Sequence, residues 1–128
     1  NLRRVGLEGS EEKFPTELSG GMQKRAGIAR VLAMKPKVIL YDDPAAGLDP
    51  VLTDSIADLI LEIRETEKTT SLIVTHDMKF AEKIADEIVL LDSSQIVFYG
   101  DKNKFFSLED PFAHQFVKGE IEGPIECQ

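Results

Sequence analysis

The sequence has a single cysteine, no long apolar run and no excess of basic residues. Cys127 lies next to the last of the 128 residues, so no disulfide can form within the chain, which is typical of a reducing compartment. The longest apolar runs, such as 38–41 and 88–91, have the length of strands and are too short to span a bilayer. No signal peptide is visible. We therefore expect no segment of this chain to enter a membrane.

The charge balance also excludes two classes of partner. The chain has 15 Lys and Arg residues against 23 Asp and Glu residues, a net charge of −8. Binding to a nucleic-acid backbone calls for clustered basic residues. Binding to a membrane surface calls for a basic amphipathic stretch. The sequence shows neither, so we expect no nucleic acid and no direct membrane contact.

A third absence concerns the loop with which many nucleotide-binding proteins hold phosphates. That loop reads G-x-x-x-x-G-K-[ST], and its two glycines stand five positions apart. No two of the nine glycines in this chain have that spacing, and the chain starts with Asn rather than Met. We therefore expect an incomplete domain.

Apolar patterns divide the chain into alternating helices and strands. Apolar positions spaced three and four apart predict helices, and continuous apolar runs predict strands buried on both faces. The expected elements are a helix over 21–34, a strand over 38–41, a helix over 51–65, a strand over 69–75, a helix over 78–85, a hairpin of strands 86–91 and 96–99, and short helices over 102–107 and 111–117. The alternation indicates an α/β fold with a parallel sheet, in which ligands bind beyond the carboxyl ends of the strands. The tail from Gly119 is expected to be loosely held.

The most informative segment is Leu18–Arg25, which reads LSGGMQKR. Ser19 can cap the following helix, and the two glycines let the free backbone N–H groups approach an anion closely. Glycines in a helix cost roughly 1 kcal/mol each relative to Ala, and close approach to a ligand is one reason to keep them. The alternative is an ordinary helix cap that tolerates glycine. Lys24 and Arg25 are expected to be solvated or paired with acids.

Polar residues follow both strands of the expected parallel sheet. Asp42 and Asp43 end the first strand, and His76 ends the second. Two carboxylates at a strand end can hold a hydrated Mg²⁺ and orient a water molecule. They can equally be a polar strand end that caps the next turn. His76 can contact a phosphate or simply leave the strand, and Asp49 can be a cap for helix 51–65.

In their order and spacing, these segments resemble the second half of the nucleotide-binding domain of ABC-type ATPases. LSGGMQKR is similar to the signature motif, VILYD at 38–42 to the Walker B strand, GLD at 47–49 to the D-loop and THD at 75–77 to the switch-histidine segment. The resemblance implies a mostly parallel sheet flanked by helices, in an incomplete P-loop NTPase domain. Residues 1–34 would end the helical subdomain, 35–100 would form part of the core, and 101–128 would supply C-terminal helices and a tail.

The resemblance also implies a role for each matching residue. Asp42 would bind Mg²⁺ through water, Asp43 would polarise the attacking water, and His76 would contact the γ-phosphate of ATP. The ATP held by the opposite subunit would be contacted by Ser19, Gly20, Gly21, Met22 and Gln23. The dimer interface would include Gly47, Leu48 and Asp49.

The partners follow from the same resemblance. It implies ATP and Mg²⁺, a second ATPase subunit in a homodimer, and transmembrane permease subunits that hold the ATPase at the cytoplasmic face of the cell membrane. The Met of LSGGMQKR, the run THDM at 75–78, and the ending FVKGE with GPI at 123–125 are similar to ATPases of the Mla/Mkl type. That similarity implies transport of phospholipid or another lipid.

Asp43 and the missing phosphate loop leave other functions open. Asp43 stands where the family usually has Glu, whose side chain is one methylene longer. The carboxylate of Asp is therefore pulled back by ~1.5 Å, and a misplacement of ~1 Å can lower a reaction rate by ~100-fold. A non-catalytic nucleotide-sensing module is therefore one alternative. The ATPase head of a chromosome- or repair-associated protein is another, although the acidic balance and the absence of heptads disfavour it. Without the phosphate loop, we expect this chain alone neither to bind ATP tightly nor to hydrolyse it.

Overall fold

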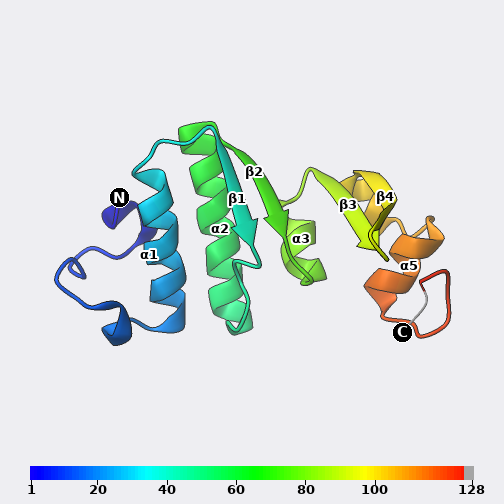
Figure 1. Ribbon diagram of the computed structural model, residues 1–128, viewed down its shortest axis with the longest axis horizontal. Coiled ribbons are helices and arrows are strands. Elements are labelled where there is room, and N and C mark those ends of the chain that lie inside the picture. The colour runs from blue at the N-terminus through cyan, green and yellow to red at the C-terminus, as the bar shows by residue number, and fades with distance from the viewer. Residues whose placement is uncertain (126–128) are drawn as a thin grey trace. The chain divides into compact units, whose positions relative to one another are not determined.

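Two parallel strands joined by a long helix form the centre of the first part of the chain. The computed structural model describes residues 1–125 (Figure 1) and divides between Phe80 and Ala81 into two units. The first unit contains η1 (Arg3–Val5), η2 (Pro15–Glu17), α1 (Gly20–Leu32), β1 (Val38–Asp42), α2 (Pro50–Glu67) and β2 (Thr70–Val74). The helix α3 (Met78–Ile84) includes the point of division, and β3 (Glu87–Asp92), β4 (Gln95–Asp101), α4 (Lys102–Phe106) and α5 (Pro111–Lys118) follow. None of the helices in residues 1–125 is both long and apolar enough to cross a membrane.

Local sequence explains where α1 and α2 begin. Ser19 precedes α1, and its Oγ accepts a hydrogen bond of 3.3 Å from the backbone N–H of Met22. Asp49 precedes α2, Pro50 occupies the first helical position, and the N–H groups of Val51 and Leu52 donate to Asp49 Oδ1 at 2.9 and 3.0 Å. Capping of this kind satisfies backbone donors that a helix leaves unpaired at its start. Both caps that the sequence predicts are therefore present.

The parallel sheet that the sequence predicts is confirmed. β1 and β2 pair in parallel, from Val38 opposite Thr70 to Asp42 opposite Val74. The buried stripe of α2, the connecting helix, consists of Ile56, Ala57, Leu59, Ile60 and Ile63. Apolar residues at this spacing form one face of a helix, which packs against a core. The α/β character of the chain therefore follows from patterns that are visible in the sequence.

The prediction that these strands are buried on both faces is wrong. On β1, Ile39 and Tyr41 are 3% and 8% exposed, whereas Leu40, which points to the other face, is 72% exposed. Its partner Leu72 on β2 is 60% exposed. Parallel strands are buried twice only when helices cover both faces of the sheet. Among the described residues of the first unit, helices cover one face, and the other face is bare and apolar.

The second unit is a hairpin with two short helices. β3 and β4 pair antiparallel, with Glu87 opposite Asp101 and an irregular register between Leu90 and Leu91. Ser93 and Ser94, which join the strands, both have positive φ, as a two-residue hairpin turn of the type I′ class requires. Phe98 of β4 packs edge-on against the buried Phe105 of α4, with ring centroids 5.1 Å apart. The hairpin that the sequence predicts is confirmed.

The described part of the tail is bonded to α5, contrary to the expectation of a loosely held tail. Gln115 is a buried polar residue of α5. Its Nε2 donates to the carbonyl of Ile125 at 2.9 Å, and the N–H of Ile125 donates to its Oε1 at 2.6 Å. A buried side-chain amide needs such partners, and the sequence offers no local signal that pairs Gln115 with the tail. Cys127 lies outside the described residues.

The bare face of the β1–β2 sheet predicts self-association of the 128-residue chain. Replacing Leu40 and Leu72 together with Lys should lower the average mass in sedimentation, because exposed apolar patches drive association and charge opposes it. Met34→Lys is the matched control, since Met34 is also exposed, at 73%, but lies in the turn after α1. An equal mass for both variants would contradict the prediction.

Candidate functional site

The two predicted strand ends come together at one edge of the sheet. The parallel register places Asp42 opposite Val74. The N–H of Asp43 donates to the carbonyl of Val74 at 2.8 Å, which continues the pairing one residue beyond β1. The side chain of Asp43 is therefore held beside His76, which follows β2. Asp43 and His76 are far apart in the sequence, and they meet because parallel strands end at the same edge of the sheet.

Both carboxylate oxygens of Asp43 have a neighbour on the β2 side. Asp43 Oδ2 lies 2.9 Å from His76 Nδ1, and Asp43 Oδ1 lies 3.5 Å from Thr75 Oγ1. The side chain of Asp43 is only 26% exposed, whereas that of His76 is 80% exposed. Because Nδ1 faces Asp43, Nε2 is the ring nitrogen that is left for a ligand. His76 and Thr75 can thus hold the carboxylate of Asp43 in one orientation, and His76 offers its second ring nitrogen to solvent.

The backbone of Asp43 has an unusual conformation. Its φ is +40°, in the left-handed region that Asp and Asn enter more readily than most residues. A residue held there costs on the order of 1 kcal/mol or more, and such positions often lie at functional sites. Here the turn directs the chain from β1 into Pro44 while the side chain stays beside β2. The conformation therefore supports a specific placement of this carboxylate.

Asp42 is the candidate for Mg²⁺. It is exposed at the last position of β1. Residues 1–125 contain no group of three or more His, Cys, Asp and Glu side chains that could hold a metal. Mg²⁺ commonly takes one or two carboxylates together with water and substrate phosphates. The donor set at this strand end therefore fits a magnesium ion held jointly with a nucleotide, and it does not fit a cage built from protein ligands alone.

The residues of the signature segment, Leu18–Arg25, divide between exposed and internal positions. Ser19 and Gly20 are exposed, whereas Gly21 is buried. The amide of Gln23 turns back, because its Nε2 donates to the carbonyls of Pro15 and Leu18 at 2.9 and 3.2 Å. The hydroxyl of Ser19 accepts from the helix and can still donate its own proton to a ligand. Ser19 and Gly20 are thus placed to meet a ligand, and Gln23 braces the segment from behind.

The GLD segment, Gly47–Asp49, lies against the signature segment. A Cβ added to Gly20 would lie 3.8 Å from Leu48 Cδ2, and one added to Gly21 would lie 3.5 Å from both Cδ atoms of Leu52. Gly47 has a φ of +75°, a conformation that glycine adopts without strain. Asp49 is the cap of α2, as its alternative role predicts. The sequence did not reveal that the two segments touch.

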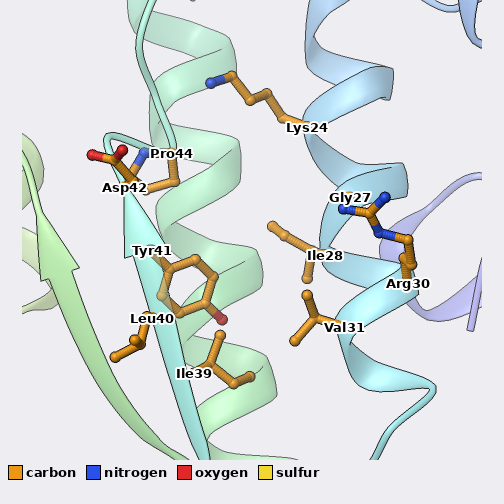
Figure 2. A pocket seen from close by; sticks show the side chains of 10 residues that line it. All are labelled: Lys24, Gly27, Ile28, Arg30, Val31, Ile39, Leu40, Tyr41, Asp42 and Pro44. Atoms are coloured by element: carbon orange, nitrogen blue, oxygen red, sulfur yellow. The ribbon is translucent and has the colours of Figure 1, made fainter.

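An apolar cleft lies between α1 and β1 (Figure 2). Its lining includes Ile28, Val31 and Ile39, and of the predicted site residues only Asp42 reaches it. Tyr41 also lines the cleft, and its hydroxyl is buried. Burial raises the pKa of this hydroxyl. Lys24 and Arg30 also line the cleft, so its walls combine apolar and basic side chains.

Lys24 and Arg25 were expected to be solvated or paired with acids, but the structure shows their side chains beside carbonyl and hydroxyl groups. Lys24 Nζ lies 3.5 Å from the backbone carbonyl of Asp43. Arg25 donates to the carbonyl of Val5 and to the hydroxyl of Ser55. Sequence reasoning missed these bonds, because none of the three accepting groups carries a charge. The only signal was their place in LSGGMQKR, directly after the glycines.

The chain is similar to curated proteins over nearly its whole length. Residues 1–46 match the family described as ABC transporter. Over 124 residues the chain is 43% identical to a probable ribonucleotide transport ATP-binding protein mkl of Mycobacterium leprae, covering 97% of this chain and 36% of that protein. Over 125 residues it is 40% identical to the methionine import ATP-binding protein MetN of Staphylococcus haemolyticus, covering 95% of this chain and 36% of that protein. The chain thus spans about a third of the length of these curated relatives.

Two solved structures show the same fold. One is cbiO1 of Clostridium perfringens, part of the ABC transporter complex cbiONQ, with a TM-score of 0.78 and 34% identity over 83% of this chain and 42% of that one. The other is an ATP-binding cassette of an ABC transporter in its ADP conformation, with a TM-score of 0.80 and 29% identity over 93% of this chain and 47% of that one. The expected α/β fold, as a partial domain, is confirmed.

Substitution of Gly21 tests whether packing between helices or contact with a ligand requires a glycine at this position. Gly21→Ala should leave the free energy of unfolding unchanged or raise it by up to about 0.5 kcal/mol, since Ala favours a helix and the new Cβ meets only Leu52 at an ordinary contact distance of 3.5 Å. Gly27→Ala, where a Cβ would meet nothing within 4 Å, is the control. Urea unfolding measures both. A loss above about 1 kcal/mol in Gly21→Ala alone would show that packing, rather than a ligand, requires this glycine.

Proposed function

Because this chain belongs to the ABC transporter ATPase family, as part of the family's nucleotide-binding domain, we propose that it serves in the ATP-binding subunit of an ABC transporter. The observation that carries the proposal is the meeting of Asp42, Asp43 and His76 at one sheet edge, with Asp43 Oδ2 2.9 Å from His76 Nδ1. A second support is the exposed start of α1. The reaction is transfer of the γ-phosphoryl group of ATP to water.

Each of the strand-end residues has a separate role in the proposed hydrolysis. Asp43 accepts a proton from the attacking water and holds it in line, and its two neighbours on the β2 side keep the carboxylate oriented. His76 presents Nε2 to the γ-phosphate. Asp42 would hold Mg²⁺ through water, and that ion would supply positive charge against the phosphate oxygens. Positioning and charge stabilisation account for most of the catalysis in such a reaction.

The signature segment completes a site that a second subunit begins. Ser19 and Gly20 are exposed at the N-terminal end of α1, where backbone N–H groups and the helix dipole favour an anion. We assign them, with Gly21, to the γ-phosphate of ATP held by the opposite subunit of a homodimer, and we assign Met22 and Gln23 to contacts with the same ATP. Gly47, Leu48 and Asp49 then lie at the dimer interface. Permease subunits hold the dimer at the cytoplasmic face of the membrane.

The same assignment accounts for what this chain lacks. Its residues supply no loop of the G-x-x-x-x-G-K-[ST] type, so the 128 residues by themselves hold neither phosphates nor adenine firmly. Calorimetry of the isolated chain with Mg-ATP tests this, and micromolar affinity would overturn it. Residues 1–34 are assigned to the helical subdomain, 35–100 to the core and 101–128 to the C-terminal helices and tail.

A lipid is the cargo that we propose for the complete transporter. The support is the resemblance of LSGGMQKR, of THDM at 75–78 and of the ending of the chain to lipid-transport ATPases of the Mla/Mkl type. The names of the relatives point elsewhere, to ribonucleotide transport and methionine import. Turnover of the complete transporter in vesicles should rise with added phospholipid. A rise with methionine or a ribonucleotide instead would refute a lipid cargo.

Asp43→Glu should raise the steady-state ATPase rate of the complete protein, because the longer side chain brings the carboxylate closer to the attacking water, and a misplacement of ~1 Å can cost ~100-fold in rate. Asp92→Glu is the matched control, since Asp92 also ends a strand but lies outside the proposed site. Phosphate release measures both. An unchanged or lower rate in Asp43→Glu would contradict the prediction that the short side chain of Asp43 limits the rate of hydrolysis.

Asp43 also favours a second candidate function, a non-catalytic nucleotide-sensing module. A short carboxylate tied to a histidine can leave a nucleotide bound without turning it over. Multiple turnovers by the complete protein exclude this function. Tight Mg-ATP binding with no turnover, even in Asp43→Glu, would favour it over the transporter ATPase.

A further inference from the structure

The first turns of α1 and α2 pack against each other. Gly21 is buried, and a Cβ at this position would lie 3.5 Å from Leu52 of α2. Gly20 lies similarly close to Leu48, within the GLD segment. α1 begins within the signature segment and α2 begins directly after the GLD segment, and the proposed function gives both segments a role at the dimer interface. The two segments therefore share a packed contact one turn behind the exposed residues.

Arg25 lies one helical turn beyond that contact. Arg25 follows Gly21 by four positions on α1, and Ser55 follows Leu52 by three positions on α2, so the two residues lie on the same helix faces as the packed pair. Nη2 of Arg25 donates to Oγ of Ser55. The second nitrogen, Nη1, donates to the carbonyl of Val5 at 2.8 Å. One guanidinium thus joins α1, α2 and the segment that contains η1.

The environment of the guanidinium fixes its plane. Val5 is fully buried, so its carbonyl is a stationary acceptor. Gly6 has a φ of +70°, and a Cβ there would lie 3.3 Å from Arg25 Nη1. The planar fork of arginine donates in two fixed directions, which the ammonium of lysine cannot reproduce. The bond to Ser55 therefore ties α1 to α2, and the bond to Val5 ties α1 to the segment that contains η1.

We propose that Arg25 is a positioning residue that makes the signature segment and the GLD segment move as one body. The proposal rests on the proposed function, because it gives these two segments their roles at a shared ATP site. Arg25 touches no reacting atom. It acts through Ser55, Leu52 and Gly21, so that a shift of the GLD segment at the dimer interface carries the signature segment with it.

Hydrogen exchange of the complete protein tests this coupling without nucleotide. Arg25→Lys should speed amide exchange in peptides from 18–25 and from 47–53 together, while exchange in β3 and β4 stays unchanged. Ser55→Ala should have the same effect in smaller measure, and Ser55→Thr, which keeps the hydroxyl, should restore slow exchange. Arg25→Lys with Ser55→Ala should be no worse than Arg25→Lys alone, since residues that act through one bond are not additive. Arg30→Lys, at an exposed position of α1, is the control.

Kinetics give the second readout. The ATPase kcat of Arg25→Lys should fall ~10-fold or more, whereas KM should change little. The reason is that the signature segment contacts the nucleotide only in the closed site, where a misplacement of ~1 Å slows the reaction. Faster exchange in only one of the two segments, or equally throughout the protein, would overturn the proposal. If the parent protein shows no ATPase activity, the proposed function fails, and the exchange data still decide the role of Arg25.

Discussion

The parallel pairing of β1 with β2 is the constraint on which the candidate site depends. It ends with Asp42 opposite Val74, and the N–H of Asp43 extends it by one more bond to the carbonyl of Val74. A shift of one residue in this register would turn each side chain to the opposite face of the sheet. Asp43 would then no longer face His76. The chemistry of the site is therefore set by backbone hydrogen bonds between two strands.

The helices add a second level of order to the same edge. Ser19 and Asp49 start α1 and α2 through side-chain caps, and the contact of Gly21 with Leu52 brings the two helix starts together. The glycines thus serve two purposes. Gly20 is exposed at the start of α1, whereas Gly21 lies at the contact between α1 and α2. A sequence reading that assigns both glycines to a ligand sees only half of this arrangement.

The bare face of the β1–β2 sheet connects the fold with the comparisons. Leu40 and Leu72 project from it into solvent, although parallel sheets are stable when both faces are covered. The chain also covers 42% and 47% of the two solved structures that share its fold. Both observations describe a partial domain. Its strand-end residues are arranged within the part that is present, whereas a phosphate loop is not among its residues.

The sequence by itself determined the elements, the helix caps, the parallel sheet and the positions of Asp42, Asp43 and His76 at strand ends. These depend on periodicity and on residues close together in the chain. Only the tertiary structure decided the pairing of Asp43 with His76 and Thr75, the one-sided burial of β1, the bonds of the Gln23 amide to the preceding loop, and the bonds of Arg25 and Gln115. Each of these depends on what distant segments place beside a side chain, and uncharged carbonyl and hydroxyl partners leave no pattern in the sequence from which that placement could be read.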